Sequence, residues 1–547
     1  MSTQAAYPFS REEAPLFPGA PWSPRHTPLN RAIYALSAFV MAMASGFGNG
    51  LITANLAFTA GDIGLTVAEG SLLLAVYVAF NATANLTLVK ARVQFGIPAT
   101  MHVVLGALIA AQLVQIAVPC FATAIVARAV SGVAAGGLST LSLYNMFQVF
   151  PLRMRPVAAI LGFCLPQLAI PLARMVPLSI ISMHEWQGLH LIELALAIGA
   201  WGMLNLMPLP PNSPARAFEP LDVVTVALII VAMLLVCTVM AVGRYDWWTD
   251  TPWLGWALAA ALPLIGAALM IEDRRQSPLL WVRWFATRDV LFFIAVAVII
   301  RLALAEQTYA AVGLLSLGGL TSDQLHGLFL GVLLAEIAGI VVVCIFSKPH
   351  QVVPLMSIAA FVIAFGAWLD THSTSLTRAP ELLLSQSLLG FGTILFLGPA
   401  LMFGIGQIIK RGPTHLVSFI VLFSTTQNLG GLAGSAALGT FQTMRARTHA
   451  QYLADAVSLG DPLVTQRLAQ YAGRLAPQLV DPALRDRQAL GQLSQALNAQ
   501  ASVLAFNDTF WVVTVVALTA GILTAAYALR EKVQRDRLQR SSESVPA

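Results

Sequence analysis

The amino-acid sequence predicts an all-α polytopic membrane protein, and three observations lead to this fold class. Hydrophobic residues make up 57% of the 547 positions, and charged residues only 10%. Fourteen apolar stretches follow one another along the chain. Each has about 20 residues, the length at which a helix crosses a bilayer core of about 30 Å. The stretches are continuous rather than alternating, so they are helices and not barrel strands, the only other structure that spans hydrocarbon.

The predicted spans are separated mostly by short polar loops. Residues 1–30 are rich in proline but lack the short apolar core of a cleavable signal peptide, so the first apolar stretch is a retained span. In chain order the predicted spans are residues 32–55, 68–89, 99–118, 121–146, 157–181, 187–207, 222–243, 253–271, 289–312, 325–346, 353–369, 382–405, 416–440 and 508–530.

The basic residues predict the orientation. With the N-terminus inside, twenty Lys and Arg residues fall in cytoplasmic segments, against Arg244 and Arg378 in the short outer loops. Positive residues collect on the cytoplasmic side, so both termini are predicted to be cytoplasmic. The net charge of +5 has the same origin, and we expect no nucleic-acid partner. The four cysteines form no CxxC pair, so we expect no disulfide framework, metal site or cofactor.

One outer loop, residues 441–507, is far longer than the others and carries six arginines. Loops of this length cross the membrane regardless of their charge, so it does not contradict the orientation. Leu468, Tyr471 and Leu475 follow helical spacing within it. We expect amphipathic helices near the outer membrane surface, which form either a solvated cap or a docking site for a partner.

Six ionisable side chains fall well inside the predicted spans. Each is expensive within hydrocarbon, so each is expected to be paired, to face a cavity and to serve function. Three are positive and three are negative: Arg128, Arg174, Arg301, Glu193, Glu306 and Glu336.

The depth of these charges predicts which of them meet. At about 1.5 Å of helix rise per residue, Arg128, Arg174 and Glu193 each lie roughly 10 Å from the outer end of their spans, which predicts one cluster. Arg301 and Glu336 both lie near mid-membrane, which predicts an ion pair. Such groups are either closed salt bridges that lock helix packing or parts of a cavity. The cluster has one positive charge in excess, which suits an anionic group on a substrate.

The lone acid Glu306 and two uncharged residues complete the candidate site. Glu306 has no predicted partner, and a carboxyl group in a dry site can hold a proton near neutral pH, so it is a candidate proton carrier; a plain hydrogen-bonding role is the alternative. Asn49 and Gln167 are uncharged polar residues within spans. They are either interhelical hydrogen bonds or substrate contacts. Prolines before and after Arg174 predict a bend in the fifth span.

Short motifs along the chain resemble those of a known family. They are Arg128-Ala-Val-Ser131-Gly132, Asp246-Trp247-Trp248, Glu272 with Pro278-Leu279-Leu280, Gln427-Asn428-Leu429-Gly430-Gly431 and Leu504-Ala-Phe-Asn507-Asp508-Thr-Phe510-Trp511. Their order and spacing resemble the major facilitator superfamily, and specifically its fourteen-helix drug:proton antiporter branch, over residues 30–535. The first motif is similar to the family's Arg-x-x-Gln-Gly, and the fourth to its Arg-Asn-Leu-Gly-Gly, with the arginine lost.

The resemblance implies two six-helix bundles with two inserted helices, around a cavity that opens alternately to each side. Spans 1, 4, 9 and 12 would line that cavity. The domains it implies are a cytoplasmic tail (1–30), an N-terminal bundle (31–208), the inserted helices (209–288), a C-terminal bundle (289–530) that includes the loop 441–507, and a cytoplasmic tail (531–547).

The chain also departs from the family pattern. Val93 and Gln94 stand where the loop after the second span usually carries an Asp-Arg pair. Arg174 stands near the family's Gly-Pro motif, and Glu193 replaces the usual asparagine. Together with Arg128, Arg174 favours an amphipathic or anionic substrate.

We therefore expect a secondary active transporter in the inner (cytoplasmic) membrane of a bacterial cell, which couples protons to the efflux of amphipathic or drug-like molecules. An organic-anion (aromatic acid) transporter with different coupling is the alternative, and a non-transporting receptor or scaffold a minor one. No GxxxxGK[ST], HExxH or GxSxG motif is present, so we expect neither a primary pump nor an enzyme. The expected partners are a small-molecule substrate, protons, the lipid bilayer and, as in some relatives, a periplasmic adaptor with an outer-membrane channel.

Overall fold

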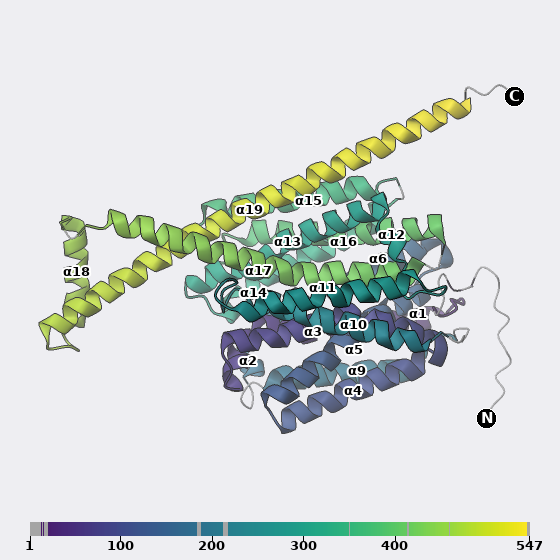
Figure 1. The fold of residues 1–547 in the computed structure, drawn as a ribbon, viewed down its shortest axis with the longest axis horizontal. Helices are drawn as coiled ribbons and strands as arrows, with labels where there is room; N and C mark the ends of the chain where they lie inside the picture. Colours follow the sequence, from purple (N-terminus) through teal and green to yellow (C-terminus); the bar gives the residue numbers. More distant parts are fainter. Residues whose placement is uncertain are drawn as a thin grey trace.

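The computed structural model describes residues 13, 15, 20–182, 187–211, 217–348, 350–412, 415–458 and 460–543, and all regular structure in them is helical. Thirteen of these helices are long and apolar enough to cross a membrane. The 30-residue α13 (Arg288–Leu317) runs beside them (Figure 1), and each predicted span falls on one long helix except the fifth, which falls on several shorter helical pieces. Most of the predicted tail 1–30 lies outside the described residues.

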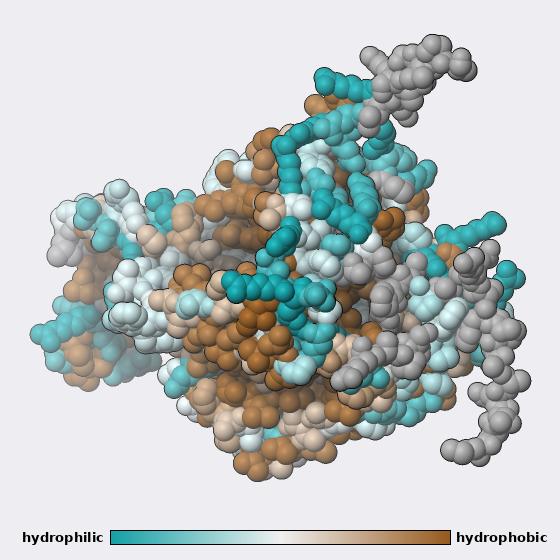
Figure 2. Space-filling view, turned by 45° about the vertical axis from the view of Figure 1, so that its right-hand side comes forward, coloured by the Kyte–Doolittle hydropathy of each residue, from teal (hydrophilic) through white to brown (hydrophobic). Residues whose placement is uncertain are grey.

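Helix α1 begins and α19 ends at the same end of the bundle (Figure 1), as an even number of crossings requires. We call this the terminal end and the opposite one the distal end. The cytoplasmic location of the terminal end stays a prediction. Figure 2 shows hydrophobic surface over the middle of the molecule, with hydrophilic side chains towards its two ends. Large apolar side chains such as Trp256 and Leu262 are exposed on a helix that is long and apolar enough to cross the membrane, as contact with lipid requires.

The N-terminal bundle is built around α5, which packs against α1, α3, α4 and α6. Gly132 of α5 allows a close approach to α3, because a Cβ atom there would lie 2.6 Å from the Tyr77 carbonyl oxygen. The short α2 (Leu56–Asp62) follows α1 at the distal end. The members of the bundle are α1 (Pro28–Ala54), α3 (Val67–Phe95), α4 (Ile97–Ala117), α5 (Phe121–Val149), α6 (Arg155–Cys164) with its continuation, and α9 (Gln187–Leu206).

The fifth span is broken, as its prolines predict. After α6 the chain passes through a 3₁₀ turn, η3 (Leu165–Leu168), into α7 (Ala169–Arg174) and the short α8 (Leu178–Ile181). Helix α1 packs against η3 and α7. This close contact depends on Gly50, where a Cβ atom would lie 2.9 Å from that of Ala173.

The C-terminal bundle also has six helices that cross its length, and its last two, α17 and α19, are the longest described in the chain. Helix α13 packs against α17 and α19, α14 packs against α16, and α15 packs against α16 and α19. The two bundles meet where α3 contacts α17, and where α6 and α7 contact α14. The other members of the C-terminal bundle are α14 (His326–Phe346), α15 (Val352–Leu369), α16 (Leu383–Arg411), α17 (Leu416–Ala456) and α19 (Pro482–Glu543).

The inserted helices α10 (Pro220–Val242) and α11 (Pro252–Asp273) lie at one seam between the bundles, where α10 packs against α3, α11 and α17. An ionic network fastens them at the terminal end. Lys90 Nζ lies 2.7 Å from Asp222 Oδ2, and Arg275 lies 2.7–2.8 Å from carboxylate oxygens of Asp222, Glu219 and Glu272.

The long outer loop differs from the expectation. It is helical, but α17 and α19 continue straight beyond the bundle, and α18 (Pro462–Leu475) crosses between them at the tip (Figure 1). The segment therefore forms an arm that projects from the distal end, rather than helices that lie flat on the membrane. Asp508 of α19 lies 2.5 Å from Arg445 and 2.7 Å from His449 of α17 and ties the base of this arm together.

Candidate substrate cavity and buried charges

A cavity of about 220 Å³ lies between the two bundles, and both contribute to its wall. Small-molecule sites usually enclose about 300–1,000 Å³, so this cavity suits a small compound, or a larger one once the halves part. The four helices that the resemblance implies all contribute, and α3 and α17 contribute more than expected. The polar lining residues are Ser45, Asn49, Tyr77, Asn81, Asn85, Ser139, Thr140, Gln167, Arg301, Ser424, Gln427 and Asn428.

Arg301 of α13 is the charged residue of this lining. Its Nε donates a hydrogen bond of 3.0 Å to the backbone carbonyl of Gln427. Gly431, one turn further along α17, leaves room for the side chain, since a Cβ atom there would lie 3.3 Å from the guanidinium. Arg301 forms no ion pair with the residues that the structure describes. The guanidinium therefore presents an uncompensated positive charge beside the position where the family motif has lost its own arginine.

The predicted ion pair between Arg301 and Glu336 is wrong. The two residues have similar depths on helices that are consecutive in sequence, but α13 packs against α17 and α19 whereas α14 packs against α16. Glu336 lies instead against Gly390 of α16, is 3% exposed, and its Oε2 has no hydrogen-bond partner among the described residues.

The rest of the cavity wall combines amides with aromatic rings. Asn428 Nδ2 of α17 donates to Asn81 Oδ1 of α3 across 3.1 Å and so links the two bundles. Phe163 of α6 and Phe423 of α17 meet edge to face, with ring centroids 4.9 Å apart. The sequence analysis missed Tyr77 and these phenylalanines, because an aromatic residue in an apolar span looks like core. The proline break beside Phe163 was the available sign that this side of the span faces a cavity.

Arg128 and Glu193 meet as predicted, in a closed network within the N-terminal bundle. Their side chains approach to 3.8 Å, and Arg128 also donates to the Gly48 carbonyl oxygen at 2.9 Å. Ser131 donates to the other Glu193 oxygen at 2.5 Å. The Arg128 guanidinium lies 4.5 Å from the centroid of the Tyr77 ring, and Tyr77 lines the cavity whereas Arg128 and Glu193 do not. This pair is therefore one aromatic ring away from the cavity and does not line it.

The same network extends to α4 and α9 through neutral polar groups. Gln112 Nε2 donates to the Ser131 hydroxyl oxygen at 3.2 Å, and Gln112 Oε1 lies 2.9 Å from His190 Nδ1. These buried groups connect α4, α5 and α9 around the Glu193 carboxylate. A buried polar network of this kind fixes how helices pack, although Arg128 Nε and Nη2 have no hydrogen-bond partner among the described residues.

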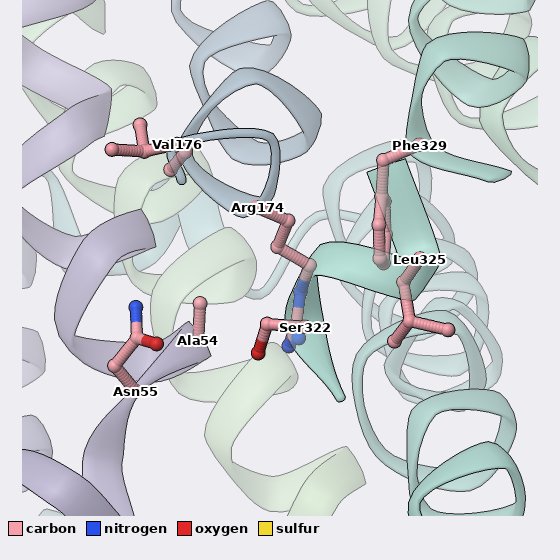
Figure 3. Close-up of a pocket in the computed structure, with 8 residues that line it drawn as sticks. Ala54, Asn55, Arg174, Val176, Ser322, Leu325 and Phe329 are labelled. Carbon is pink, nitrogen blue, oxygen red and sulfur yellow. The ribbon is translucent and has the colours of Figure 1, made fainter. Parts of the chain in front are cut away.

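Arg174 does not join that cluster. It is the last residue of α7 and lies at the distal end, in a small pocket between Ala54 and Asn55 of α1 and the C-terminal bundle (Figure 3). Its guanidinium lies 5.2 Å from the centroid of the Phe329 ring of α14. The depth estimate assumed one continuous helix, and the break in the fifth span carries Arg174 away from the other two residues.

The two bundles also touch directly at this end. The Leu178 backbone N–H, which begins α8, donates to Asp323 Oδ1 in η4 (Ser322–Leu325) across 3.1 Å. With the Arg174–Phe329 contact, this bond holds the distal end of the α7–α14 seam together.

Glu306 lies on α13 but faces α16 instead of the cavity. Gln386 Nε2 donates to Glu306 Oε1 at 3.0 Å and to Asp370 Oδ2 at 2.9 Å. The sequence analysis missed Asp370, because it directly follows the predicted span 353–369. An acidic residue at the last turn of a span was the sign that could have found it.

The family motifs at the distal end hold loops in place. Trp248 Nε1, in the loop after α10, donates to the Thr440 hydroxyl of α17 at 2.8 Å. Asn507 Nδ2 of α19 donates to the Ser373 carbonyl oxygen at 2.8 Å. These residues fix the architecture and contribute nothing to the cavity wall.

Comparisons with known proteins agree with this architecture. No protein-family model matches the chain. YhcA of Bacillus subtilis (strain 168), an uncharacterized MFS-type transporter, is 24% identical over 442 residues, which cover 78% of this chain and 79% of that protein. A solved proton-dependent oligopeptide transporter gives a TM-score of 0.55 at 12% identity, over 91% of this chain and 99% of its own. The human organic anion transporter MFSD10 (TETRAN) gives 0.50 at 13% identity, over 89% and 99%.

The chain is therefore a homologue of an MFS-type transporter, and its fold is that of the major facilitator superfamily. It is a multi-pass membrane protein. The relative and the structural neighbours are transporters and not enzymes, as the sequence analysis expects.

Proposed function

We propose that this protein is a proton-coupled secondary transporter of the drug:proton antiporter type in a bacterial inner membrane, and that it exports small amphipathic compounds. One observation carries the proposal: a cavity between the two bundles joins an apolar aromatic wall to polar groups and one uncompensated guanidinium. Such a wall holds the apolar part of a ligand by burial, and its few polar groups fix the orientation.

A second candidate is a transporter of organic anions such as aromatic acids. Arg301 favours it, because an unpaired guanidinium in a half-buried site binds a carboxylate through two parallel hydrogen bonds. Phe163 and Phe423 lie in the same wall and suit an aromatic ring. One structural neighbour is named as an organic anion transporter, although the likeness extends to the fold alone.

The coupling proton is proposed to bind at Glu306. Arg301 and Glu306 share helix α13 and are five residues apart, which is about 7.5 Å along the helix axis. A movement of α13 that follows substrate binding at Arg301 therefore also moves the Glu306 carboxyl group. The distal arm is the surface to test for a periplasmic adaptor, which stays a prediction from the resemblance.

Transport by the purified protein in proteoliposomes tests the proposal. A pH gradient is imposed, a pH-sensitive dye is trapped inside, and ethidium, benzoate and deoxycholate are added separately. We expect at least one of these compounds to collapse the gradient faster than in empty liposomes, with the compound moving against the proton. Arg301→Gln should abolish the response to the two anions.

The result also decides between the candidates. A response to ethidium that survives Arg301→Gln would favour the drug exporter over the anion transporter. Benzoate or deoxycholate flux that is the same with and without the pH gradient would leave an organic-anion transporter with different coupling. No flux of any compound in correctly oriented, folded protein would support the receptor or scaffold alternative.

A further inference from the structure

We infer that Glu306, Asp370 and Gln386 form one proton-binding site, in which two buried carboxyl groups share a single proton. The inference rests on the proposed function, for which it supplies the site of the coupling ion. It adds Asp370 as a second acid and Gln386 as a positioning residue, so the pair and not Glu306 alone becomes the titrating unit.

The geometry places both acids on one amide nitrogen. Gln386 Nε2 has two hydrogens, and its two hydrogen bonds reach Glu306 Oε1 at 3.0 Å and Asp370 Oδ2 at 2.9 Å. Gln307 Nε2 donates to the Gln386 backbone carbonyl at 3.1 Å and so ties α16 to the helix that carries Glu306. Three elements, α13, α16 and η5 (Asp370–His372), therefore converge on this point.

The burial of the pair means that it cannot carry two charges. Glu306 is 0% exposed and Asp370 is 2% exposed. Two carboxylates that share one neutral donor in a dry site repel each other, so one of them keeps its proton. Glu306 Oε2 is buried and has no hydrogen-bond partner among the described residues, which leaves one acceptor position open for that proton.

The charged groups on the surrounding elements are engaged elsewhere. Arg301, on the same helix as Glu306, points to the Gln427 carbonyl oxygen. The nearest histidine in sequence, His372, hydrogen-bonds the Thr371 hydroxyl at 2.9 Å. On α17 and α19 the charged residues near this end, Arg445, His449 and Asp508, bond to one another.

Arg378, before α16, donates to the backbone carbonyl oxygens of Ser375 and Thr377. No cation among the described residues forms an ion pair with either acid of the pair. A proton is therefore the positive charge that this site takes.

The position of the pair suits proton exchange with the distal side. Asp370 directly follows the last residue of α15, and Gln386 lies in the first turn of α16, so both are close to the distal ends of their helices. Proton loading breaks one O–H bond of a hydronium ion in the distal water and forms one O–H bond on a carboxylate oxygen, and unloading to water reverses the step. The pair that has bound a proton carries one negative charge instead of two, which favours its burial. The pair that has released the proton carries both negative charges, which favours its contact with water.

Infrared difference spectroscopy of the purified protein in nanodiscs tests the site without a substrate. The probe is the proton itself: spectra are recorded across a pH series, and the C=O band of a protonated carboxyl group is followed. All spectra are recorded on the background variant Glu336→Gln. This change removes a further buried carboxyl group that forms no ion pair with the described residues and would contribute its own band. We expect a carboxyl band near neutral pH on this background, and its loss in the double variant Glu306→Gln/Asp370→Asn.

Single variants test whether the two acids act as a unit. With Asp370→Asn, Glu306 loses its like-charged neighbour, so the band should disappear at a pH lower by about one unit or more, and Glu306→Gln should shift the remaining band in the same direction. Gln386→Leu, which keeps both acids but removes their shared donor, should change the band position. A band that titrates identically with and without Asp370 would overturn the shared site and leave Glu306 acting alone.

Failure of this inference is distinguishable from failure of the proposed function. If wild-type proteoliposomes show no proton-coupled flux but the band and its shifts are present, the site stands and the proposed function fails. If flux is proton-coupled and the Glu306→Gln/Asp370→Asn variant keeps that coupling, the site is overturned and the proposed function stands. A missing carboxyl band on the Glu336→Gln background also overturns the site.

Discussion

The two bundles share one helical plan but treat their buried charges in opposite ways. In the N-terminal bundle, Arg128 is 1% exposed, and its charge is answered by Glu193 and a chain of neutral groups. In the C-terminal bundle, Arg301 faces the cavity without a counter-ion among the described residues, and Glu306 has a second acid beside it instead of a base. The Arg128–Glu193 pair is therefore neutralised within the resting protein, whereas Arg301 and the Glu306–Asp370 pair are completed only by a ligand or a proton.

This difference separates two roles that look identical in the sequence. Buried ionisable residues in a membrane protein are expected to be functional by default. The Arg128–Glu193 pair instead has a structural role, because a closed ion pair fixes helix packing and its loss destabilises the fold. The following predictions test the division, from the largest expected effect to the smallest.

The largest effect is expected for Glu193→Gln. This change leaves the buried Arg128 without its counter-charge, which should lower the free energy of unfolding by about 3–5 kcal/mol. Thermal unfolding of the purified protein measures it. Arg128→Met combined with Glu193→Gln should regain most of the loss, and Glu336→Gln, which removes a lone acid, should not destabilise. Equal losses for Glu193→Gln and Glu336→Gln would erase the distinction between the bundles.

Arg301→Gln should leave stability unchanged but weaken the binding of an anionic ligand. A hydrogen bond to a charged group contributes about 1.5–3 kcal/mol, so the dissociation constant of deoxycholate or benzoate should rise by about 10- to 100-fold. Titration calorimetry on the purified protein measures it. Arg301→Lys is the matched control that keeps the charge and should lie between the wild type and Arg301→Gln. Destabilisation comparable to that of Glu193→Gln would make Arg301 a packing residue.

Gly48→Ala sharpens the comparison within the N-terminal network. A Cβ atom at this position would lie 2.6 Å from Glu193 Oε1, so the carboxylate must move away from Arg128. Overpacking of this kind destabilises by about 1–3 kcal/mol. The control is Gly202→Ala on α9, where a Cβ atom meets nothing within 4 Å. The two melting curves should differ, and identical curves would show that Glu193 has room to adapt.

The smallest effect concerns the clamp on the inserted helices and depends on pH. Hydrogen bonds from the Ser277 hydroxyl and the Arg275 guanidinium hold the pKa of Glu219 below its usual value. A carboxyl group whose pKa is lowered on folding stabilises the protein above its unfolded pKa and loses this contribution as the pH falls. Melting curves of wild type and Glu219→Gln should therefore differ slightly near neutral pH and converge below about pH 4. A difference in melting temperature between the two proteins that grows as the pH falls would contradict this prediction.

The sequence was sufficient for the helices because one property, the length of an apolar run, decides whether a segment spans the bilayer. It was sufficient for Arg128 and Glu193 because their depths agree and both of their helices pack beside α1, where Gly48 leaves the space they occupy. Depth is only one coordinate. Matched depth gave a wrong ion pair for Arg301 and Glu336, because their helices do not pack side by side. Two charges form a pair only when they lie at the same depth and on neighbouring helices.

The remaining errors have local causes. Arg174 follows a proline-induced break that ends its helix early, so a count along an ideal helix misplaced it. Asp370 directly follows a predicted span, where an acidic residue looks like a loop residue, although the fold buries it. The arm was expected as amphipathic helices near the outer membrane surface, because an amphipathic pattern does not say whether an apolar face meets lipid or another helix. These features depend on tertiary packing, which no local pattern in the chain records.

The placement of α10 and α11 makes the molecule one-sided. On the flank where they sit, α3 and α17 are joined directly through Asn81 and Asn428, and the loop after α10 is bonded to α17 through Trp248. On the opposite flank α6 and α7 pack directly against α14, and α6 also packs against α16, with no inserted helix among the described residues between this seam and the lipid. A compound dissolved in the lipid would reach the interior from there without passing an extra pair of helices.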